Sequence, residues 1–88
     1  MTINIKFLKN KIIYRANYRG TKEMDILLGS FTKKYINQLT EDELILLCNL
    51  LNYDDENLYK INQGLQTTID IESNKITKLL KQYKYTEG

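Results

Sequence analysis

The residues best suited to chemistry in this chain stand close together between positions 18 and 31. Arg19 and Gly20 precede a segment with helical spacing, and Glu23 and Asp25 fall in its first two turns. An arginine guanidinium is a planar fork of donors suited to carboxylates and phosphates, and glycine lets a backbone turn or approach another molecule closely. Because both charge signs and a glycine are gathered here, the segment predicts a surface that contacts a partner.

Tyr18 extends this surface, because tyrosine supplies a rigid interface anchor at little cost in side-chain entropy. A plainer interpretation is also open: Tyr18 could be half-buried, and Glu23 and Asp25 could simply complement a helix dipole, at about 0.3–1 kcal/mol each. A purely structural joint between helices would not need Arg19, so we interpret it as functional. The candidate partner-binding residues are Tyr18, Arg19, Gly20, Glu23 and Asp25.

Residue types used in catalysis are scarce. The chain has no histidine and a single cysteine, Cys48, so neither a conventional zinc site nor a Cys-His or Ser-His nucleophile can be assembled. Its glycines are isolated, at Gly20, Gly29, Gly64 and Gly88, which excludes a glycine-rich phosphate loop. We therefore expect no catalytic residues, no metal site and no enzymatic activity.

Length and charge limit the remaining possibilities. A chain of 88 residues supports one hydrophobic core, so residues 1–88 are expected to form a single domain. The net charge of +2 is too small to indicate nucleic acid or an anionic membrane by itself. The longest apolar run, residues 44–48, falls far short of the roughly 20 residues that span a bilayer. A single cysteine suits a reducing compartment.

The elements that must position the candidate residues are helical. Apolar residues recur at helical spacing in five segments, and no segment alternates long enough to predict a strand. A capping box at Thr40 and Glu43 opens the third segment, whose apolar body predicts a central helix. Gly29 indicates a close helix approach or a local break. The chain should therefore be an all-α, compact bundle of five short helices, within residues 1–18 and at about 21–37, 40–51, 54–62 and 70–83.

Basic residues at the N-terminus leave an alternative open. Residues 1–18 contain four basic residues and no acidic one, which superficially suits a targeting peptide, although Ile12 and Ala16 take part in a helical repeat. The third and fourth helices resemble a helix-turn-helix, but Asp54, Asp55 and Glu56 would face the phosphates and be repelled. A basic first helix that contacts RNA or a membrane surface therefore stays as the weaker alternative.

The run from Arg15 to Phe31 resembles the family of small succinate dehydrogenase assembly factors, the bacterial SdhE-type proteins and their mitochondrial relatives. A second landmark of the family, D-x-x-L-Y, is followed here by Gly64. The likeness covers roughly residues 15–64. Ile61 takes the place where the family usually has tryptophan, and a proline often found after the glycine is missing. The first pattern, R-G-x-x-E-x-D-x-x-L-G-x-F, is met by Arg19, Gly20, Glu23, Asp25, Leu28, Gly29 and Phe31, and the second by Asp55, Leu58 and Tyr59.

This resemblance implies a five-helix bundle without a catalytic site of its own. Such a protein binds the flavoprotein subunit of succinate dehydrogenase, or in some bacteria fumarate reductase, and promotes covalent attachment of FAD to a histidine there. It binds no cofactor stably and is expected in the bacterial cytoplasm. We also expect no membrane insertion and no nucleic acid as partner, and a monomer before partner binding is the default expectation. The family's main functional surface carries over onto Arg19 and Gly20, with Glu23 and Asp25 as neighbours. A generic helical adaptor for another protein remains the alternative from a different class.

Overall fold

Five α-helices make up the fold, as the sequence predicts. The computed structural model describes residues 4–84, and within them no strand is present. The chain is therefore all-α over the described part, and the expected five-helix bundle is confirmed. The helices are α1 (Ile5–Asn17), α2 (Lys22–Tyr35), α3 (Glu41–Leu50), α4 (Asp55–Gln63) and α5 (Lys75–Gln82).

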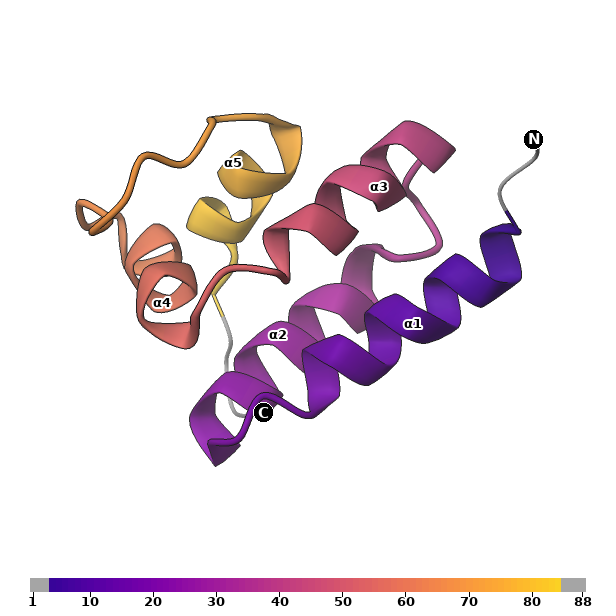
Figure 1. Cartoon of the computed structure of the whole chain (residues 1–88), viewed down its shortest axis with the longest axis horizontal. Helices are drawn as coiled ribbons and strands as arrows, with labels where there is room; N and C mark the ends of the chain where they lie inside the picture. The colour runs from indigo at the N-terminus through magenta and orange to yellow at the C-terminus, as the bar shows by residue number, and fades with distance from the viewer. Residues whose placement is uncertain (1–3, 85–88) are drawn as a thin grey trace.

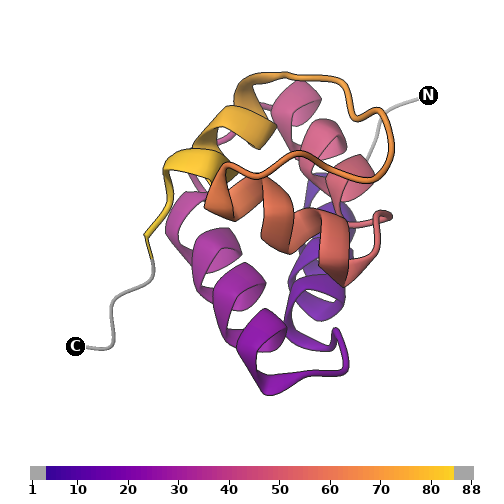
Figure 2. The same ribbon diagram turned by 90° about the vertical axis from the view of Figure 1, so that its left-hand side faces the viewer.

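Helices α1 and α2 form an antiparallel hairpin along one side of the molecule (Figure 1). Helix α3 packs against both α1 and α5, and α5 packs in turn against α4. Seen from the side, α4 and α5 lie over the hairpin with the long connection between them at the outer surface (Figure 2). Helix α3 thus joins the two halves, which agrees with its expected central place. None of the helices in residues 4–84 combines the length and apolarity needed to cross a bilayer.

Local capping sets where the helices begin and end. The Thr40 hydroxyl accepts a hydrogen bond from the Glu43 amide, and the Glu43 carboxylate accepts one from the Thr40 amide, so the predicted capping box is present. Asp54 precedes α4 as expected, but its carboxylate accepts from the Asn57 side chain rather than from a helix amide. Helix α4 ends at Gly64, whose φ of +72° is a left-handed conformation that favours glycine.

The core fills the space between the hairpin and the other three helices. Each helix contributes fully or almost fully buried apolar side chains, and α3 contributes three leucines. Burial of this kind stabilises a fold by about 25 cal/mol per Å² of apolar surface. Cys48, the single cysteine, is half-buried and packs against the core. The core residues of α1, α2 and α3 include Ile12, Ala16, Met24, Leu28, Phe31, Leu44, Leu47 and Leu50, and those of α4 and α5 include Leu58, Ile76 and Leu80.

The expected start of the fifth helix near residue 70 is wrong. Helix α5 begins at Lys75, because Asn74 forms a cap: its side-chain oxygen accepts hydrogen bonds from the amides of Ile76 and Thr77. Residues 65–74 instead form an extended connection. The buried Asn57 of α4 holds this connection by accepting from the Thr68 amide at 2.8 Å. The Asn74 cap therefore sets the start of α5, and the Thr68 contact anchors the connection that precedes it.

Candidate functional site

The turn between α1 and α2 presents Gly20 at the surface. Gly20 has a φ of +112°, a conformation that side-chain-bearing residues rarely adopt. A Cβ atom built at this position would meet nothing within 4 Å. The backbone conformation therefore requires glycine, while the space beside Gly20 is open to another molecule.

Arg19, directly before Gly20, turns its side chain into the fold. The side chain is only 12% exposed, and its Nε donates to Asp55 Oδ1 at 2.8 Å. Its Nη1 donates to the Leu51 carbonyl and its Nη2 to the Tyr53 carbonyl, each at 2.8 Å. Leu51 closes α3 and Asp55 opens α4, so this guanidinium joins the α1–α2 turn to the α3–α4 connection.

Asp25 holds the same turn from the other side. Its carboxylate accepts a hydrogen bond from the Arg19 backbone amide, and Asp25 is half-buried in the first part of α2. Arg19 is thus fastened through both its backbone and its side chain. The interpretation that a structural joint would not need this arginine is wrong, because three donors of the guanidinium are engaged within the fold.

The other candidate residues are open to solvent. Tyr18 is 70% exposed, and Glu23 is exposed in the first turn of α2. Glu23 also borders a groove of about 410 Å³ between α2 and α4. The structure therefore divides the candidate set into an outer group, Tyr18, Gly20 and Glu23, and an inner group, Arg19 and Asp25. The groove is further lined by Met24, Ile26, Leu27, Tyr59, Asn62, Gln63 and Lys84.

Gly29 marks a close approach of α1 to α2. A Cβ atom at Gly29 would collide with the side-chain amide of Asn17, the last residue of α1, whose Nδ2 donates to the Ile13 carbonyl at 2.7 Å. Helix α2 runs without interruption through Gly29. Of the two expectations for this glycine, the close approach is confirmed and the helix break is wrong.

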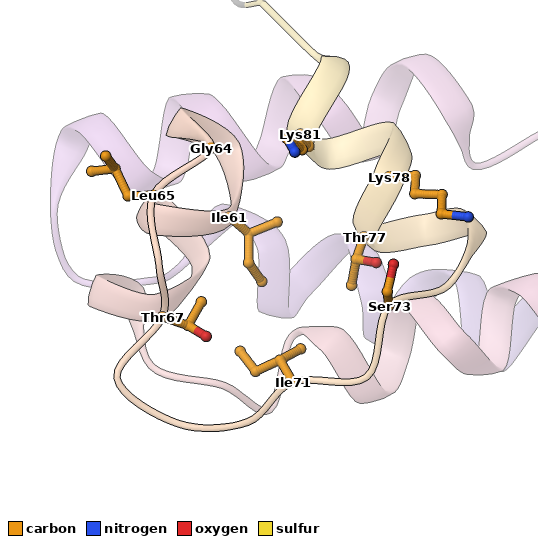
Figure 3. Close-up of a pocket in the computed structure, with 9 residues that line it drawn as sticks. All are labelled: Ile61, Gly64, Leu65, Thr67, Ile71, Ser73, Thr77, Lys78 and Lys81. Carbon is orange, nitrogen blue, oxygen red and sulfur yellow. The ribbon is translucent and has the colours of Figure 1, made fainter.

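Ile61, the departure from the family pattern, borders a second pocket. This pocket has a volume of about 310 Å³ and lies between α4, α5 and their connection. Ile61 and Ile71 point into it from opposite sides, and Thr77 lies across from them (Figure 3). Ile61 is half-buried and packs against the core. Within residues 4–84, no group of three or more acidic, histidine or cysteine side chains could hold a metal ion.

Sequence reasoning missed the role of Asp55. The sequence places Asp55 only at the start of the fourth helix and in the second family pattern, whereas the structure makes it the ionic partner of Arg19. No local signal in the sequence indicates this pairing, because the two residues are 36 positions apart. Tyr14, which was not among the candidate residues, is 65% exposed, and the centroid of its ring lies 4.7 Å from that of Tyr18.

Comparison with known proteins settles the relationship. A family model described as the flavinator of succinate dehydrogenase matches residues 10–84. The chain belongs to this flavinator family. The FAD assembly factor SdhE of Wigglesworthia glossinidia brevipalpis is 37% identical over 78 residues, covering 88% of this chain and 89% of that protein. No solved structure matches the chain.

Relatives in the flavinator family also occur in eukaryotes. The mitochondrial succinate dehydrogenase assembly factor 2 of Drosophila grimshawi is 34% identical over 82 residues, covering 90% of this chain but 56% of that protein. The FAD assembly factor SdhE of Acetobacter pasteurianus is 30% identical over 79 residues, covering 90% and 70%. The chain thus spans most of its bacterial relatives and about half of the mitochondrial one.

Proposed function

We propose that this flavinator-family chain binds the flavoprotein subunit of succinate dehydrogenase and promotes covalent attachment of FAD to it. The observation that carries the proposal is the family match over residues 10–84, with bacterial relatives named as FAD assembly factors. Fumarate reductase, whose flavoprotein subunit is bound by some members of the family, is a second client to test. The chain acts as a helper, because without histidine it has no residue to carry a histidyl flavin.

The docking surface is proposed to be the outer group at the α1–α2 turn. Gly20 leaves open space at the surface, and the exposed side chains of Tyr18 and Glu23 stand on either side of it in the sequence. Arg19 and Asp25 act as positioning residues, because their hydrogen bonds hold the turn in its conformation. A partner would therefore meet a turn that is ordered before binding, which lowers the entropy cost of association.

The rate of flavin attachment depends on holding the flavin ring and the acceptor histidine close and aligned, so positioning alone lowers the barrier. A helper accelerates the step if it binds the aligned conformer of the flavoprotein more tightly than the others. FAD then stays on the partner, since this chain has no glycine-rich phosphate loop. No catalytic residue of this chain takes part.

Two further aspects belong to the proposal. The chain is expected to work in the bacterial cytoplasm, in keeping with a lone cysteine, Cys48, that suits a reducing compartment. Before it meets its partner, the chain is expected to be a monomer. Analytical ultracentrifugation of the free chain would test the second point, and a dimer at micromolar concentration would contradict it.

In-gel flavin fluorescence tests the function directly. The apo flavoprotein subunit from the same cell is incubated with FAD alone, with the native chain, or with the Gly20→Arg variant. Faster covalent labelling with the native chain than with the variant is the expected result, because an arginine at position 20 fills the open space at the turn.

Equal labelling in all three reactions, with a folded chain and a competent subunit, would overturn the proposed function. The generic adaptor would then lead among the alternatives, since it predicts no effect on flavin attachment. A basic nucleic-acid or membrane-surface binder would differ from both, because its affinity falls steeply as salt is added.

A further inference from the structure

Three strongly exposed aromatic residues lie along the outward side of α1 and at the residue that caps its C-terminal end. Phe7, Tyr14 and Tyr18 are 68%, 65% and 70% exposed. Phe7, the exposed Lys11 and Tyr14 are spaced by four and three residues, which keeps them on one side of α1. Tyr18 follows as the non-helical residue that caps the C-terminal end of α1, with its ring against that of Tyr14. Fully buried Ala16 lies on the opposite side of α1, so these four residues, here called the aromatic stripe, face away from the core.

No helix covers the aromatic stripe in the part of the chain that the structure describes. Helix α1 packs against α2 and α3 through its other side, and it forms the outer flank of the molecule (Figure 1). The rings of Tyr14 and Tyr18 pack on each other with their centroids 4.7 Å apart, which restrains both side chains before any partner binds. Clustered exposed aromatics are a feature of interaction surfaces, where tyrosine and phenylalanine are enriched.

Within α1, the charged side chains that accompany the aromatic stripe have one sign. Helix α1 contains the basic residues Lys6, Lys9, Lys11 and Arg15 and no acidic residue. Of these, Lys6 and Lys11 are exposed. A complementary surface must therefore supply carboxylates to the lysines and apolar area to the rings, which describes an acidic protein surface with an apolar centre.

Other occupants fit less well. A second copy of this chain would place α1 against α1 in a symmetric contact, which brings basic residues together. A bilayer takes up the aliphatic side of an amphipathic helix, but that side of α1, with Ile5, Leu8 and Ile12, already packs against the core. Nucleic acid would be held weakly by a chain of net charge +2.

We propose that the aromatic stripe extends the docking surface and receives an acidic, partly apolar face of the flavoprotein subunit. Tyr18 belongs both to the stripe and to the α1–α2 turn, so the two surfaces are continuous. The inference rests on the proposed function for the identity of the partner. It adds that binding depends on α1 over its full length, and that electrostatic attraction contributes to it.

Isothermal calorimetry with the apo flavoprotein subunit tests the aromatic stripe at low and high salt. Tyr14→Ala and Lys11→Glu should each weaken binding by about tenfold or more, a typical loss at an interface anchor or a reversed contact charge. Tyr14→Phe should retain affinity, because it keeps the ring. Lys78→Glu is the matched control, an exposed lysine on α5, and should stay within about twofold of the native chain. Added salt should weaken the native chain more than the Lys11→Glu variant.

The outcomes separate the two proposals. Equal, tight binding by the native chain and all folded variants overturns the aromatic stripe and leaves the proposed function standing. Absence of binding and of faster flavin attachment with the native chain overturns both.

The same variants are also mixed with phosphatidylglycerol vesicles and with a single-stranded oligonucleotide. Loss of binding to either probe, with flavoprotein binding unchanged, would reassign the stripe to a membrane or to nucleic acid and overturn the inference.

Discussion

Arg19 and Asp55 lie 36 positions apart in the sequence, and their side chains form an ion pair of 2.8 Å. The same guanidinium donates to the carbonyls of Leu51 and Tyr53, so one side chain provides hydrogen-bond donors for two backbone carbonyls in the connection between α3 and α4. Helix α4 is thereby fixed relative to the α1–α2 turn. The consequence is that the surface around Gly20 depends on a contact far away in the sequence.

Removing this guanidinium should weaken the fold. Arg19→Ala leaves Asp55 and two carbonyls without their donor, and we expect the free energy of unfolding to fall by about 2–3 kcal/mol. Arg19→Lys should recover little of this, because one ammonium cannot reproduce the fork. Urea denaturation followed by circular dichroism measures both.

Lys60→Ala provides the control for the Arg19 variants. Lys60 pairs with Glu56 at 3.4 Å on the surface of α4, where the Glu56 side chain is 62% exposed. Such exposed pairs contribute about 0.3–0.5 kcal/mol. If Arg19→Ala proved no more destabilising than Lys60→Ala, the guanidinium would have no structural role.

Two variants of Gly20 distinguish the effect of backbone strain at this position from the effect of a large side chain. Gly20→Ala and Gly20→Arg both force a side-chain-bearing residue to a φ of +112°, at a cost of about 1–3 kcal/mol in the free energy of unfolding. Because the adjacent space is open, the two variants should be similarly stable. In the flavin attachment assay, however, Gly20→Arg should lose more activity than Gly20→Ala. A collapsed circular dichroism spectrum for Gly20→Arg alone would show that bulk damages the fold rather than docking.

The contact between Gly29 and Asn17 should appear as coupling between two substitutions. Alanine within a helix is favoured over glycine by about 1 kcal/mol, but a Cβ at position 29 must displace the Asn17 side chain. We therefore expect Gly29→Ala to be nearly neutral in the native chain and stabilising by about 1 kcal/mol in an Asn17→Ala background. Thermal or urea unfolding of the four chains gives the coupling energy, and strict additivity would argue against the contact.

Glu43 should make the stability depend on acid pH. Hydrogen bonds from the Lys75 ammonium and the Thr40 amide lower the pKa of the Glu43 carboxyl below its usual 4.5. The carboxylate therefore stabilises the fold above pH 4.5, and this contribution is lost as the pH falls through the lowered pKa. The difference in the free energy of unfolding between the native chain and Glu43→Gln should be constant near neutral pH and should shrink as the pH falls below 4.5. Urea unfolding from pH 7 to pH 3 measures it, and a constant difference throughout would refute the assignment.

Local signals in the sequence predicted most of the fold. The Thr40–Glu43 capping box acts through contacts a few residues away and appears in the structure as expected, and Gly64 ends α4 in a similarly local way. The start of α5 was missed because Asn74 caps the helix by accepting hydrogen bonds from the amides of Ile76 and Thr77. The spacing of apolar residues does not register where such a cap stands.

The sequence by itself determined the class of fold, the family pattern and the small set of residues around Arg19 and Gly20. These depend on residue type and on short, regular spacing, which the chain displays directly. The tertiary structure alone decided how that set divides: Arg19 and Asp25 are bound within the fold, while Tyr18, Gly20 and Glu23 face solvent. It also placed Tyr14 against Tyr18 at the surface. Whether a polar side chain is available to a partner depends on which distant groups reach it, and that is settled only when the helices pack.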